Sequence, residues 1–116
     1  MEELPCEVVF PNTVSPAALA LLQQFDAATI RNAQAIALAE VVEDAQRAIQ
    51  AREKSLAAWA RYCDALKNDL PAEELYAMAV RAGAAADFAR ATAETTRAGL
   101  AVLEEAVAAL DGRPPA

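Results

Sequence analysis

The side chains that could take part in catalysis are few and poorly arranged for it. The chain has no histidine, which removes the commonest general base and metal ligand. Glu40 and Glu43 share a helix face, but carboxylates at this spacing are typical of a solvated surface. Cys63 has no candidate base, and Cys6 and Cys63 are too few for a zinc site. We therefore predict no enzymatic activity, no cofactor and no metal.

The composition of the 116 residues predicts an all-α domain. Alanine, the strongest helix former, occurs 32 times against three glycines, and aromatic residues make up only 5% of the chain. β-Branched and aromatic residues, which favour strands, are correspondingly scarce. The elements to expect are therefore helices, and 116 residues suffice for one domain.

The charge excludes some classes of partner. The formal net charge is −7, with ten basic residues scattered among seventeen acidic ones. Nucleic acids and anionic membranes both require clustered Lys and Arg, so we expect neither as a direct partner. The first ten residues, MEELPCEVVF, lack the pattern of a signal peptide, and no uncharged run is apolar enough to span a membrane. We predict a cytoplasmic protein.

Helix-start and helix-stop residues divide the chain into an arm, a hairpin and a tail. Ser15 and Pro16 are typical of a helix start, and Pro71, followed by two glutamates, is typical of another. Gly112 fits the residue after a helix. We predict an extended arm over 1–14 and a helical hairpin over 15–112. The hairpin comprises a helix over 15–69, a hinge at 69–71 and a helix over 71–111, followed by a flexible tail over 113–116.

A heptad-like spacing predicts that the two helices pack against each other as an antiparallel, coiled-coil-like hairpin. In the first helix, residues alternately three and four apart form one seam. These residues are Val42, Ala45, Ile49, Arg52, Leu56, Trp59, Cys63, Leu66 and Leu70. The facing residues of the second helix are mostly alanines, so large side chains should oppose small ones. Cys63 is then expected in the core.

The first helix carries more apolar side chains than such a hairpin can bury. Either this helix breaks near Asp26 and its front folds back as a third helix, or another chain covers the surplus. We favour another chain, most simply a copy that completes an antiparallel four-helix dimer. The residues predicted to bind the partner are Leu22, Phe25, Ile30, Ile36, Leu38, Val41, Arg52, Tyr62 and Tyr76.

These patterns predict a non-enzymatic protein–protein interaction module, either a scaffold or assembly subunit or a small helical chaperone. One alternative is an acidic inhibitor, of the kind encoded by phages, that docks on a basic, nucleic-acid-handling target. Another is an amphipathic binder of lipid or granule surfaces.

Overall fold

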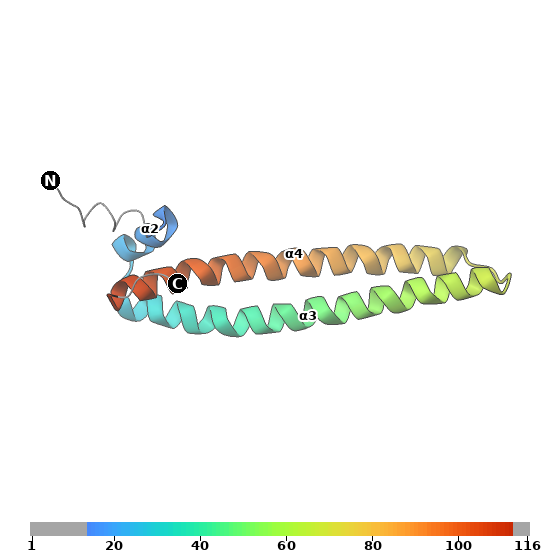
Figure 1. Ribbon diagram of the computed structural model, residues 1–116, viewed down its shortest axis with the longest axis horizontal. Coiled ribbons are helices and arrows are strands. Elements are labelled where there is room, and N and C mark those ends of the chain that lie inside the picture. Colours follow the sequence, from blue (N-terminus) through green and yellow to red (C-terminus); the bar gives the residue numbers. More distant parts are fainter. Residues whose placement is uncertain (1–13, 113–116) are drawn as a thin grey trace. The chain divides into compact units, whose positions relative to one another are not determined.

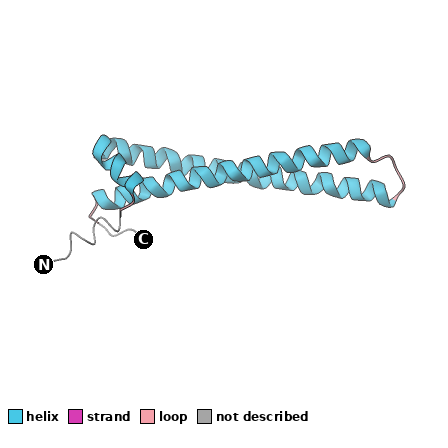
Figure 2. Ribbon diagram, turned by 90° about the horizontal axis from the view of Figure 1, so that it is seen from above, coloured by secondary structure: helices cyan, strands magenta, loops and turns pink. Residues whose placement is uncertain are grey.

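The computed structural model describes residues 14–112 and contains three helices within that range. They are α2 (Pro16–Gln24), α3 (Ala27–Lys67) and α4 (Glu73–Leu110). The predicted all-α helical hairpin is confirmed: α3 and α4 run antiparallel and are joined by a short loop (Figure 1). Residues 14–112 include no strand (Figure 2). Residues 1–13 of the arm expected over 1–14, and the tail expected over 113–116, lie outside the described residues.

Contacts divide the fold into two units. Among the described residues, unit 1 combines 14–40 with 96–112, and unit 2 is Val41–Thr95. Unit 1 thus holds α2, the start of α3 and the end of α4. Unit 2 holds the rest of α3, the loop and most of α4.

The predicted continuous helix over 15–69 is two helices, separated at Phe25 and Asp26. Phe25 adopts an extended conformation, with φ −129° and ψ 150°, which ends α2. An oxygen of the Asp26 carboxylate then accepts a hydrogen bond of 2.8 Å from the Thr29 backbone N–H, as a helix N-cap does. At the other end of α2, the Ser15 hydroxyl accepts from the backbone N–H of Ala18. Both helices therefore begin at a side chain that satisfies a free backbone N–H.

The break lets α2 cover an apolar surface of its own chain. The core of unit 1 consists of Ala18, Ile30, Ala106 and Val107, one or two from each helix. Partly buried side chains packed against this core are Val14, Leu21, Leu22, Val102 and Leu103. Helix α2 therefore covers part of the apolar surface of α3 and α4 in unit 1. We had expected another chain to cover this surface.

The loop between α3 and α4 is a compact helix stop. Asp69 has a left-handed φ of 57°, and the Leu70 N–H donates to the Ala65 carbonyl at 2.9 Å. This pairing across five residues is typical of a Schellman cap, in which a left-handed residue ends a helix. Here the left-handed residue is an aspartate, not the more usual glycine. The following helix begins at Glu73, two residues later than predicted from Pro71.

Within unit 2, α3 and α4 meet along a face of small residues, which we call the inner seam. Its buried and half-buried members on α3 are Val41, Asp44, Ala48, Ala51, Ser55, Ala58, Tyr62 and Ala65. On the other side of the seam, Ala72 lies in the loop just before α4, and the members on α4 are Leu75, Ala79, Ala82, Ala86, Ala89 and Ala93. Both sets alternate steps of three and four residues, and small side chains let two backbones approach closely.

The seam predicted for α3 is therefore wrong by one residue. Each observed inner-seam residue on α3 directly precedes a residue of the predicted seam, from Val41 before Val42 to Ala65 before Leu66. Cys63, expected in the core, is exposed. The alanine face provides close contact along both helices, whereas the larger side chains would have held the backbones apart.

Candidate interaction surface

The displaced residues form an exposed apolar face on α3 of unit 2, which we call the outer strip. Its members are Val42, Ala45, Ile49, Arg52, Leu56, Trp59, Cys63 and Leu66, all exposed except Ala45, which is half-buried. The five large apolar side chains among them are between 36% and 59% exposed. Arg52 is the only charged residue of the strip. Single exposed apolar residues are ordinary, but a regular series on one helix face indicates an interaction surface.

The outer strip and the inner seam are adjacent faces of one helix. Every strip residue follows an inner-seam residue, and one residue turns an α-helix by about 100°. Helix α3 thus carries two heptad series, of which α4 occupies one. A helix in a four-helix bundle contacts two neighbours in this way, one on each of two adjacent faces.

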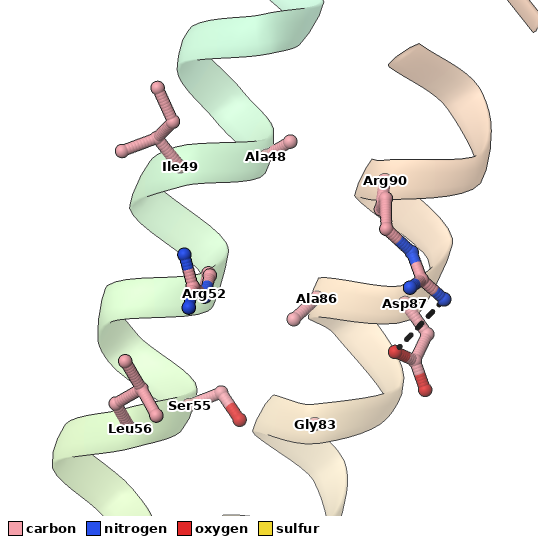
Figure 3. A pocket seen from close by; sticks show the side chains of 9 residues that line it. All are labelled: Ala48, Ile49, Arg52, Ser55, Leu56, Gly83, Ala86, Asp87 and Arg90. Carbon is pink, nitrogen blue, oxygen red and sulfur yellow. Dashed lines mark ion pairs between the residues drawn. The ribbon is translucent and has the colours of Figure 1, made fainter. Parts of the chain in front are cut away.

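A groove lies beside the strip, between α3 and α4 of unit 2 (Figure 3). It has a volume of about 540 Å³. The lining residues are Ala48, Ile49, Arg52, Ser55, Leu56, Gly83, Ala86, Asp87 and Arg90. Figure 3 shows the strip residues on α3 and the small residues Gly83 and Ala86 across from them on α4. The small residues leave room for a side chain from outside, and the Ser55 hydroxyl lies between the two helices.

Charged side chains edge this groove. Arg90 forms an ion pair with Asp87 at 3.6 Å, along α4. Both side chains are well exposed, so the pair contributes little to stability. Arg52 lines the same groove from α3. Polar residues at the border of an apolar patch are typical of protein–protein interfaces.

Three aromatic rings cluster near the loop end of unit 2. Trp59 lies edge-on to both Tyr62 and Tyr76, with ring centroids 5.8 Å apart in each case. The centroids of Tyr62 and Tyr76 are 5.3 Å apart. A hollow of about 550 Å³ adjoins the two tyrosines and Leu66. The tyrosines predicted to bind a partner are thus brought together beside the outer strip.

The other predicted partner-binding residues fall into three groups. Phe25, Ile36 and Leu38 are exposed, all in unit 1. Leu22 and Val41 are half-buried, Leu22 against the core of unit 1 and Val41 in the inner seam. Ile30 is 2% exposed and belongs to that core, so its side chain offers no surface to a partner.

Sequence reasoning missed most of the outer strip as a free surface. Ile49, Leu56 and Leu66 were assigned to the inside of the hairpin because their spacing is correct for a seam. The sequence of α3 contains two heptad series offset by one residue, and this pattern could have indicated that the helix has two contact faces. Phe88, 75% exposed on α4, was also missed. Phe88 does not belong to a heptad series, so no pattern in the sequence indicated that its side chain is exposed.

Two features of other functional classes are absent from the described part of the chain. No three His, Cys, Asp or Glu side chains of residues 14–112 group together as metal ligands would. None of the helices α2–α4 combines the length and hydropathy that crossing a membrane requires.

The fold and its surface define a class, a helical hairpin with an exposed apolar strip. Comparison with protein-family models, with curated proteins and with solved structures finds no significant match to this chain.

Proposed function

We propose that this protein is a non-enzymatic interaction module that docks a helix of a protein partner on the outer strip of α3. The single observation that supports this is the exposure of Val42, Ile49, Leu56, Trp59 and Leu66 on one face. They belong to the outer strip, whose 3/4 spacing matches the knobs and holes of a facing helix and has no counterpart in a small-molecule site.

The energetics of covering the strip fit such a role. Full burial of one large apolar side chain contributes ~1.5–3 kcal/mol, so covering five half-exposed ones contributes about 4–7 kcal/mol. A partner helix with a similar face contributes a comparable amount. Together these terms are of the size needed to offset the estimated cost of association, ~4–15 kcal/mol. Arg52 and the groove charges would then select among apolar helices by their charge.

Strip-dependent binding is the test. The double variant Ile49→Asp, Leu56→Asp places two charges on the strip, at residues that are exposed in the folded chain. The matched control Gln50→Asp, Ala57→Asp has the same spacing and added charge, on exposed residues about 100° further round α3. Circular dichroism is the check that both variants keep their helical content.

The wild-type protein and both variants are immobilised and used to capture proteins from the source cell. We expect a partner that is retained by the wild type and the control and lost with the strip variant. This partner, once purified, should bind the wild-type chain in a fixed ratio. Equal retention by strip variant and control would show that the docking face lies elsewhere.

A further inference from the structure

We propose that the occupant of the outer strip is the same strip of a second copy, running antiparallel, with the two-fold axis level with residue 54. This inference rests on the proposed function, because it takes the strip as the docking face and adds the identity of the partner. It concerns only unit 2, whose two helices would form a four-helix bundle with those of the second copy.

The strip is its own complement in this register. Residues whose numbers sum to 108 come level, so every member of the strip meets another member. Val42 lies level with Leu66 of the second copy, Ala45 with Cys63, Ile49 with Trp59, and Arg52 with Leu56. The axis repeats each pair, which gives eight layers. In an antiparallel pair of heptad helices, the two seam positions face each other in this alternating manner.

Arg52 decides between the antiparallel and parallel arrangements. In a parallel dimer in register, Arg52 would face Arg52 of the second copy inside an apolar seam, where like charges are strongly unfavourable. In the antiparallel register, Arg52 instead faces Leu56. Glu53 of the second copy lies three residues of helix rise away, about 4.5 Å along the axis. An arginine side chain spans that distance, so the two Arg52 and two Glu53 side chains that flank the axis can pair crosswise, and each arginine gains an acidic partner.

The groove of unit 2 supplies room for the large side chains of the second copy. On α3, the lining residues of the groove lie between Ala48 and Leu56. Within that stretch, Arg52 comes level with Leu56 of the second copy, and Ile49 comes level with Trp59 of the second copy. The opposite wall contains Gly83 and Ala86, which project little into the groove (Figure 3). A volume of about 540 Å³ on each copy exceeds that of a tryptophan side chain.

Disulfide cross-linking measures this register directly, since Cys63 already lies on the strip. The variant Ala45→Cys, in a Cys6→Ser background, places a thiol level with Cys63 of the second copy. Under copper–phenanthroline oxidation, we expect a covalent dimer whose peptide map joins the segments around residues 45 and 63. The same variant with Cys63→Ser should give no such dimer. Ala57→Cys, off the strip, is the matched control and should not cross-link.

A second pair of cysteine variants tests the same register in case the first variant does not fold. Val42→Cys and Leu66→Cys replace exposed side chains, each in a background without Cys6 and Cys63. Mixing the two proteins should give a mixed covalent dimer at least tenfold in excess of either self-linked dimer. In-register parallel pairing would instead link each variant to itself, and this result would overturn the proposal.

Light scattering on a sizing column provides the remaining test. We expect a dimer at micromolar concentration, whose dissociation constant rises at least tenfold with Ile49→Asp and is unchanged with Gln50→Asp. A monomeric wild-type chain would overturn the proposal, and so would a dimer that Ile49→Asp leaves intact. If the chain is monomeric while a different protein is captured through the strip, the proposed function holds and the second copy is excluded.

Discussion

Ser15 and Glu105, ninety residues apart, are joined by two hydrogen bonds in unit 1. The backbone N–H of Ser15 donates to one carboxylate oxygen of Glu105 at 3.0 Å, and its hydroxyl donates to the other at 2.7 Å. The same hydroxyl accepts from the Ala18 N–H at 3.2 Å. The residue that starts α2 is thus held by α4, so the cap of one helix is also a tertiary contact.

The first prediction follows from this link. Glu105→Ala removes both acceptors from Ser15 and should destabilise the chain by about 1.5–3 kcal/mol, the usual range for hydrogen bonds to a charged group. Urea unfolding, followed by circular dichroism, measures the loss. The control is Glu104→Ala, at the exposed neighbouring residue of α4, which should change stability by less than about 0.5 kcal/mol. Equal losses would contradict a specific role for Glu105.

The second prediction concerns acid and the start of α3. Hydrogen bonding from the Thr29 side chain, and then from its backbone N–H, lowers the pKa of Asp26 below its ordinary value. A carboxyl with a lowered folded-state pKa stabilises the fold above its unfolded pKa, and this contribution disappears as pH falls through the folded pKa. We therefore expect wild-type stability to fall in that acidic window more than that of Asp26→Asn.

The carboxyl ¹³C shift of Asp26 reports its pKa, and acid-range unfolding of wild type and variant reports the stability difference. Asparagine caps helices about as well as aspartate, so the two proteins should be similar in the neutral range except for the charge contribution. A stability difference that stays constant through the acidic window would contradict the prediction.

The third prediction separates the inner seam from the outer strip. Ala79 is fully buried in the inner seam, so Ala79→Leu overpacks the contact between α3 and α4 and should cost about 1–3 kcal/mol. Ala84 is exposed on the same helix, and Ala84→Leu should be close to neutral. Thermal unfolding measures both variants. Similar midpoints for the two would show that the small residues do not form the contact.

The fourth prediction concerns two glycines of α4 and the one that follows it. A Cβ on Gly83 would meet Trp59 Nε1 at 3.8 Å, an ordinary contact, and one on Gly99 would meet nothing within 4 Å. Alanine at either residue should therefore stabilise the helix by about 0.5–1 kcal/mol. Gly112 has a φ of 71°, so Gly112→Ala should destabilise by about 1 kcal/mol. Chemical unfolding of the three single variants checks the signs.

Local signals in the sequence were sufficient for the start of the first helix and the end of the last. Ser15 and Pro16 start α2, and Gly112 follows α4 with a left-handed backbone, as predicted. The break at Phe25 and Asp26 was only one of two alternatives, because neither residue prevents a helix from continuing. The decision depends on burial of Leu21 and Leu22 against a core that includes Val107, which is distant in sequence.

The sequence by itself determined that the chain is helical, where its hairpin turns, and that it has more apolar surface than two helices can hide. Helical content follows from alanine, and the turn from residues near Pro71, because both depend on neighbours within a few residues. Only the tertiary structure decided which face of α3 meets α4. The inner seam and the outer strip are heptad series with the same periodicity, so periodicity alone does not show which of them contacts α4. The choice between them depends on how closely two backbones can approach, which no single helix reveals.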